Sequence, residues 1–183
     1  LMGTQLTLKN GKPSKGDIVL VLKADKALGQ EGYRISIGDV TTVSAATVKG
    51  LKWGTRTVLQ MAEQNKSNGG TLPKGTVVDS PEYGLRGFMM DCGRKFIPMD
   101  YLRSLVKTMA YYKMNTLQIH LNDNGFRQFF DGDWDKTQAA FRLECDTYPG
   151  LTARDGSYTK KEFIDLQKLA EQYGVNIIPE MDV

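Results

Sequence analysis

The most constraining feature of this 183-residue sequence is the regular alternation of short apolar runs and amphipathic helical patterns in its second half. The apolar spacing predicts helices over residues 98–113 and 159–174, and Thr159 with Glu162 has the spacing of a capping box. Apolar runs that predict strands flank these helices at residues 87–91, 116–121 and 175–179. A strand–helix–strand–helix–strand order favours a parallel sheet with helices against one face.

The first 80 residues have a less regular pattern that predicts a small α/β domain. Residues 48–64 have helical spacing, and strands are expected at residues 17–23, at 76–78 and as a pair within 32–43. Gly50 and Gly54 weaken the helix by up to about 1 kcal/mol each, and they allow another backbone to approach closely. Pro and Gly in residues 79–84 mark a linker. We therefore expect one domain over residues 1–82 and a second over residues 83–183.

Composition argues against several functional classes. The net charge is +3 with basic and acidic residues interspersed, so we expect no nucleic-acid partner. No apolar run approaches the roughly 20 residues that span a bilayer, so we expect no membrane span. Cys92 and Cys145 are too few for a disulfide framework and are expected to be free thiols. The single histidine, His120, lacks metal-ligand spacing, so neither a metal nor a cofactor is expected.

Polar residues follow each of the three strands predicted in the second half. The strand ends carry Asp91 to Arg94, His120 to Asp123, and Glu180 to Asp182. One such end has an ordinary explanation as a cap or a surface charge, but three in succession favour a site, because functional side chains gather at the carboxyl ends of parallel strands. Arginine donors and carboxylate acceptors suit a polyol, whereas a phosphate would meet no glycine-rich cradle. A metal bound by His120 and the nearby acids is the less favoured alternative.

Four segments at these positions resemble family-20 glycoside hydrolases, the β-N-acetylhexosaminidases. They are RGFMMDCGRKFIP at residues 86–98, MAYYKMNTLQIHLND at 109–123, YTK at 158–160 and IPEMD at 178–182. The first 80 residues are similar to the small α/β domain that precedes the barrel in that family. The resemblance implies an N-terminal sheet-plus-helix domain followed by the first three βα units of a TIM (β/α)8 barrel. A complete barrel takes about 250 residues, so we expect a truncated one here.

The resemblance also implies roles for individual residues. Arg94 matches the substrate-binding arginine that grips hydroxyls of the terminal N-acetylhexosamine, and His120, Asp123 and Asp182 match a supporting polar network. Members of the family use substrate-assisted hydrolysis, in which the acetamido oxygen of the sugar attacks the anomeric carbon. An Asp-Glu pair on a later strand orients the acetamide and protonates the leaving oxygen. That pair has no counterpart here, so we expect no catalytic residue in these 183 residues and no activity from them alone.

For the full-length parent, the resemblance implies an enzyme that removes terminal N-acetylhexosamine from glycans, in a secreted, periplasmic or cell-surface location in a bacterium. The alternatives are a non-catalytic glycan-binding protein on the same scaffold and a module used only for interaction. Open sheet edges are expected to make the fragment self-associate. Gly93 stands where the family commonly has serine. Trp53 is expected in the core of the first domain, and Trp134 is a candidate for stacking on a sugar.

Overall fold

A computed structural model of the chain describes residues 6–69, 71–123, 128, 131–133 and 141–182. The chain divides into two compact units, Leu1–Gly84 and Leu85–Val183. Helices and strands form at the positions that the apolar patterns predict, within one or two residues at their ends. Within the described residues, no helix combines the length and the apolar character that crossing a membrane requires.

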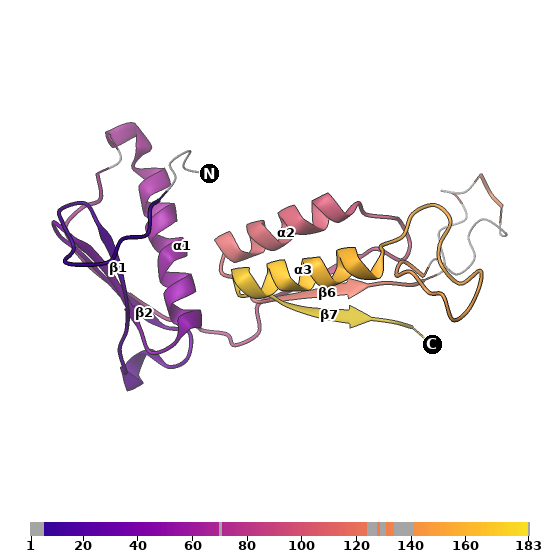
Figure 1. Cartoon of the computed structure of the whole chain (residues 1–183), viewed down its shortest axis with the longest axis horizontal. Helices are drawn as coiled ribbons and strands as arrows, with labels where there is room; N and C mark the ends of the chain where they lie inside the picture. The colour runs from indigo at the N-terminus through magenta and orange to yellow at the C-terminus, as the bar shows by residue number, and fades with distance from the viewer. Residues whose placement is uncertain (1–5, 70, 124–127, 129–130, 134–140, 183) are drawn as a thin grey trace. The chain divides into compact units, whose positions relative to one another are not determined.

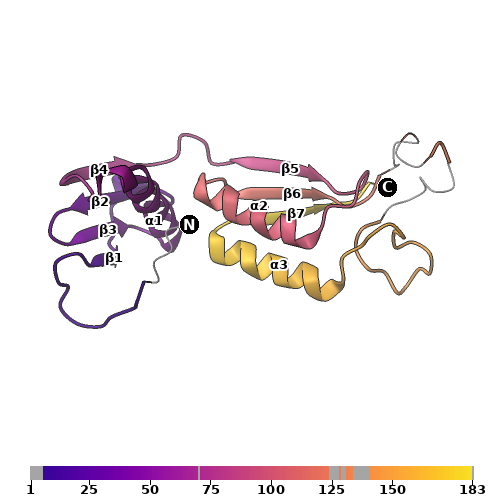
Figure 2. The same ribbon diagram turned by 90° about the horizontal axis from the view of Figure 1, so that it is seen from above.

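The first unit is a four-stranded mixed sheet with one long helix on one face (Figure 2). The strand order is β1-β3-β2-β4, with β1 parallel to β3 and the other neighbours antiparallel. The elements are β1 (Ile18–Leu22), β2 (Tyr33–Ile37), β3 (Thr41–Ala45), α1 (Val48–Gln64) and β4 (Gly75–Asp79), with short 3-10 turns at Lys26–Leu28 and Lys66–Asn68. This arrangement agrees with the sheet-plus-helix domain expected from the sequence.

Two glycines let α1 pack tightly on this sheet. A Cβ on Gly54 would lie 2.4 Å from Cγ1 of Val43, and one on Gly50 would lie 2.5 Å from the carbonyl oxygen of Gly32. The close approach expected at these glycines is therefore confirmed, and it compensates for their low helix propensity. Trp53 is buried in the same core and donates from Nε1 to Glu31 at 2.7 Å, whereas Trp134 lies outside the described residues.

The second unit is a parallel sheet of order β5-β6-β7 with two helices on one face (Figures 1 and 2). Its elements are β5 (Gly87–Asp91), α2 (Met99–Tyr111), β6 (Thr116–His120), α3 (Lys160–Tyr173) and β7 (Asn176–Glu180). The side chains of Leu117 and Ile119 on the central strand belong to the core that includes α2 and α3. Because side chains alternate along a strand, Gln118 and His120 point to the opposite face.

The ends of α3 follow from its sequence. Thr159 accepts from the backbone N–H of Glu162 at 3.1 Å, and the Glu162 side chain accepts from the backbone N–H of Thr159 at 2.9 Å, which completes the expected capping box. Gly174 ends the helix in the left-handed conformation, with φ of 78°. These signals fix where α3 begins and ends, and the chain then enters β7, the strand that ends in Glu180.

Candidate functional site

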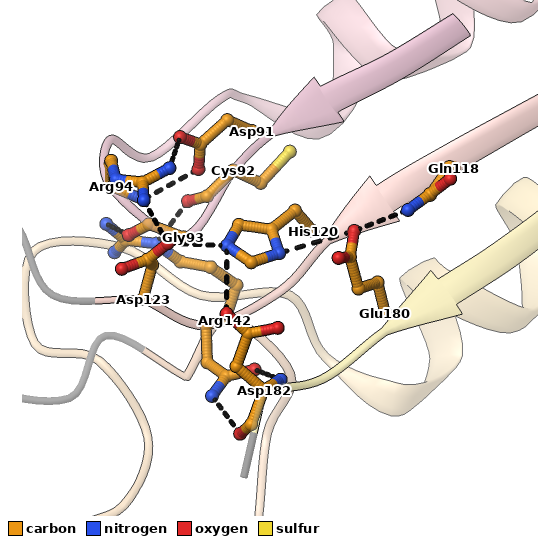
Figure 3. A network of polar contacts seen from close by, with 11 residues as sticks. Asp91, Cys92, Gly93, Arg94, Gln118, His120, Asp123, Arg142, Glu180 and Asp182 are labelled. Atoms are coloured by element: carbon orange, nitrogen blue, oxygen red, sulfur yellow. Dashed lines mark hydrogen bonds and ion pairs between the residues drawn. The ribbon is translucent and has the colours of Figure 1, made fainter.

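The register of the parallel sheet brings three polar side chains into one row. Asp91 of β5 pairs with His120 of β6, and His120 pairs with Glu180 of β7. All three are the last residues of their strands and share the face opposite α2 and α3, so the strand-end rule brings them to one edge of the sheet (Figure 3).

Arg94 lies between two carboxylates at this edge. Its Nη1 is 2.8 Å from Oδ2 of Asp91, and its Nη2 is 2.5 Å from Oδ2 of Asp123. Asp91 also accepts from the backbone N–H of Arg94 at 3.0 Å, so the turn after β5 is fixed at both the main chain and the side chain. The Arg94 side chain is 37% exposed, which leaves the guanidinium within reach of a solute.

His120 is the centre of the acidic cluster. Its Nε2 lies 2.8 Å from Oδ2 of Asp123 and 3.8 Å from Oδ2 of Asp182, and its Nδ1 lies 3.3 Å from Oε2 of Glu180. Burial lowers the pKa of His120, but the hydrogen bond to Asp123 and the neighbouring charges of Glu180, Asp182 and Asp91 outweigh burial and raise the pKa above its ordinary value. This cluster therefore favours the imidazolium form.

Two amide side chains fix the third strand end. Gln118 donates from Nε2 to Oε2 of Glu180 at 2.7 Å. Asn122 donates to the backbone carbonyl of Asp182 at 2.8 Å and accepts from the backbone N–H of Asp182 at 2.9 Å. The end of β7 is thus tied to the end of β6 by side chains as well as by the sheet.

The chemistry of the cluster suits a polyol better than a cation. Among the described residues, His120, Asp123 and Asp182 offer ligand atoms within 4.8 Å of one another, which is the grouping that could hold a metal ion. Arg94 already places a positive charge 2.5 Å from Asp123, and this charge opposes a cation at that oxygen. Fixed donors and acceptors side by side match the hydroxyls of a sugar ring.

The four residues expected to form a site, Arg94, His120, Asp123 and Asp182, therefore lie together, although nothing bound to them tests their roles. Sequence patterns did not assign a role to Gln118 or to the buried Arg142. Gln118 had a signal in its alternation with His120 along one strand. Arg142 lies in an irregular connection, where no periodic pattern marks a buried position.

Cys92 directly follows the last residue of β5. It is 0% exposed, and burial raises the pKa of its thiol, which opposes a role as nucleophile. Both Cys92 and Cys145 are free thiols, as expected.

Comparison with known proteins places both parts of the chain in one family. Residues 83–183 match the model of the glycosyl hydrolase family 20 catalytic domain, and residues 1–80 match that of glycosyl hydrolase family 20 domain 2. A beta-hexosaminidase of Akkermansia muciniphila is 36% identical over 158 residues, which cover 85% of this chain and 32% of that protein.

Solved structures give the same result. The GH20 beta-N-acetylhexosaminidase of Streptomyces coelicolor A3(2) aligns with a TM-score of 0.74 at 26% identity, covering 93% of this chain and 35% of that one. A mutant Streptomyces plicatus beta-hexosaminidase in complex with the product GlcNAc aligns with a TM-score of 0.73 at 25% identity, covering 91% and 34%. The chain thus spans about a third of the relatives that it matches. It belongs to glycosyl hydrolase family 20.

Proposed function

We propose that the full-length protein is an exo-acting β-N-acetylhexosaminidase and that these 183 residues supply the small domain that precedes its barrel and the first three βα units of that barrel. The observation that carries this proposal is Arg94, held by Asp91 and Asp123 at the ends of β5 and β6 with 37% of its side chain exposed. Family membership supports the activity, and the GlcNAc complex of a relative supports the class of sugar.

In this proposal each residue has a distinct task. Arg94 donates to hydroxyls of the terminal N-acetylhexosamine, and its ion pairs with Asp91 and Asp123 fix the guanidinium before the sugar arrives. His120 contacts Asp123 and holds it in place, and Asp182, 3.8 Å from Nε2 of His120, adds negative charge beside that imidazole. The acetamido oxygen of the sugar supplies the nucleophile, so these residues bind and orient rather than form a covalent bond.

We propose further that the 183-residue chain has no turnover by itself, because the strand ends that the structure describes hold no adjacent Asp-Glu pair to orient the acetamide and protonate the leaving oxygen. On the sheet face opposite the helices, Met89 and Ile178 are 51% and 48% exposed. Exposed apolar side chains beside unpaired strand edges favour association, so the chain alone should self-associate with rising concentration. Light scattering that reports a monomer at every concentration would contradict this part of the proposal.

The test is hydrolysis by the full-length protein of 4-nitrophenyl N-acetyl-β-D-glucosaminide, compared with the corresponding glucoside. Substrate assistance predicts turnover of the N-acetyl sugar and little of the glucoside, which lacks the acetamide. Arg94→Ala should cost about 2–3 kcal/mol of transition-state stabilisation, which is a fall in kcat/KM of roughly 30- to 150-fold.

Arg103→Ala is the matched control, since Arg103 is also 37% exposed and pairs with an aspartate three residues away, Asp100, but lies on α2. It should leave kcat/KM unchanged. Binding of GlcNAc without turnover would favour a glycan-binding protein on the same scaffold. A full-length protein that neither binds nor hydrolyses the N-acetyl sugar would refute the proposal.

We also propose a secreted, periplasmic or cell-surface location in a bacterium, where glycans carrying terminal N-acetylhexosamine are accessible. The family resemblance supports this location. Fractionation of cells of the source organism tests it, and recovery of the protein in the cytoplasm alone would contradict it.

A further inference from the structure

Arg142 is a charged side chain buried completely beside the site, at 0% exposure. Its guanidinium faces one carboxylate, that of Asp155, with Nη1–Oδ1 and Nη2–Oδ2 distances of 2.5 and 3.1 Å. Removing an arginine from water is costly, and a buried ion pair is often no more stabilising than an apolar replacement of similar volume. Stability alone is therefore a weak explanation for Arg142, and its remaining partners become the informative ones.

Besides Asp155, Arg142 donates to three carbonyl oxygens: Nη1 reaches that of Gly156 at 2.9 Å, and the other two lie on the turn that carries Arg94. Nε donates to the carbonyl oxygen of Cys92 at 2.7 Å, and Nη2 donates to that of Gly93 at 3.0 Å (Figure 3). These are the two peptide carbonyls immediately before Arg94. The guanidinium carbon also lies 5.8 Å from the ring centre of Phe96, two residues after Arg94.

The same connection holds the far end of this turn. Tyr158 donates its hydroxyl to the carbonyl oxygen of Ile97 at 2.6 Å, and its ring lies 5.3 Å from that of Phe96. At Gly156, an added Cβ would lie 2.4 Å from the Phe96 ring, so the connection approaches the turn as closely as a glycine allows. Residues 92–97 are thus held at both ends by residues 142–158.

Arg142 also reaches the strand end that carries Asp123. Its backbone N–H donates to the carbonyl oxygen of Leu121 at 2.8 Å, two residues before Asp123. One residue therefore bonds to both segments whose side chains meet in the Arg94–Asp123 ion pair.

We infer that Arg142 is a positioning residue that sets the place of Arg94 relative to Asp123, and that Asp155 acts with it by balancing its charge. This inference rests on the proposed function only in that Arg94 binds the substrate. Lysine cannot replace Arg142, because a single ammonium cannot reach the carbonyls of Cys92 and Gly93 and both oxygens of Asp155 together.

A double-mutant cycle in the full-length protein tests the inference through activity on 4-nitrophenyl N-acetyl-β-D-glucosaminide. Arg142→Lys should lower kcat/KM about 10- to 100-fold, since small displacements of a positioning group have effects of that order. If Arg142 acts through Arg94, the same exchange in an Arg94→Ala background should change kcat/KM less than 3-fold. Equal effects in both backgrounds would overturn the inference.

Leu166→Ala is the control for loss of stability, since Leu166 is also 0% exposed but packs in the core that includes α2 and α3. It should lower the melting temperature while leaving kcat/KM within 2-fold. Asp155→Asn keeps the inference testable if Arg142→Lys does not fold, because the Asp155 side chain is 42% exposed and tolerates exchange. Asp155→Asn should also lower kcat/KM, and, as for Arg142→Lys, this effect should largely disappear in the Arg94→Ala background.

Hydrogen exchange separates failure of this inference from failure of the proposed function. The amides of residues 92–97 should exchange faster in Arg142→Lys and Asp155→Asn, but not in Leu166→Ala. Unchanged exchange in the first two variants would overturn the inference whatever the activity. Faster exchange together with a wild-type protein that neither binds nor hydrolyses the sugar would refute the proposed function and leave the positioning of this turn supported.

Discussion

Replacing Asp123 by asparagine tests the polar network at its most connected atom. A single oxygen, Oδ2 of Asp123, lies 2.5 Å from Nη2 of Arg94 and 2.8 Å from Nε2 of His120. Asparagine keeps the size and shape of the side chain and removes its charge. The Arg94 guanidinium and the His120 imidazole then share a neutral amide in place of the carboxylate.

The burial of Asp123 sets the size of the effect. Exposed ion pairs are worth about 0–1 kcal/mol, and removing one partner of a fully buried pair costs about 3–5 kcal/mol. The Asp123 side chain is 17% exposed and that of Arg94 is 37% exposed, so this ion pair is intermediate between an exposed pair and a fully buried one. We therefore expect Asp123→Asn to lower the free energy of unfolding by about 1.5–3 kcal/mol, the range for hydrogen bonds to charged groups.

The same change should lower the pKa of His120. Burial lowers this pKa in the wild type, and the hydrogen bond to Asp123 is the largest of the contributions that raise it. The sequence holds one histidine, so the imidazole resonance of the 183-residue chain can be followed by NMR without ambiguity. Urea denaturation of the same sample gives the free energy of unfolding.

Asp146→Asn is the matched control, because Asp146 forms an ion pair with Lys160 and its side chain is 74% exposed. It should change the free energy of unfolding by less than about 0.5 kcal/mol and leave the pKa of His120 unchanged. The reasoning would be refuted if Asp123→Asn behaved like this control, with the pKa of His120 unchanged.

Three further predictions concern single positions. Gly93→Ala should cost about 1–3 kcal/mol, since its Cβ would lie 2.7 Å from the carbonyl carbon of Asn122; a melting temperature equal to wild type would contradict this. Thr159→Ala should cost about 1 kcal/mol through the lost cap of α3, measured by urea denaturation, while Thr159→Ser should restore most of it. The folded-state pKa of His120 is raised, so its stabilising contribution is complete below the unfolded pKa of about 6.5 and is lost as pH rises through the folded pKa. The stability difference between wild type and His120→Gln should therefore be larger at pH 5.5 than at pH 9, and an equal difference would count against the imidazolium form.

The elements of the fold were predictable because their signals are local. The helical spacing at residues 48–64 marks α1 at both ends, and the Thr159–Glu162 box marks the start of α3. The meeting of Arg94 with Asp123 was also predictable, because parallel strands bring their carboxyl ends to one edge whatever the sequence between them. At Gly93 the structure shows why no side chain fits: the turn packs directly on the backbone of Asn122 and Asp123.

Long-range contacts made by irregular segments were not predictable. Arg142 and Asp155 lie in the connection between β6 and α3, where neither a period of 3.6 nor one of 2 applies. An arginine in such a segment is ordinarily exposed, and only the folded chain shows that it is buried against the carbonyls of Cys92 and Gly93. Gln118 was missed for a related reason, since its partner Glu180 is 62 residues away in sequence.

The most direct test of the central claim is a crystal structure of the full-length protein with N-acetylglucosamine bound. The account predicts ring hydroxyls within about 3.2 Å of the Arg94 guanidinium, at the carboxyl ends of β5 and β6, with Asp91 and Asp123 still bonded to Arg94. A sugar bound elsewhere, or bound at these strand ends without contact to Arg94, would contradict it.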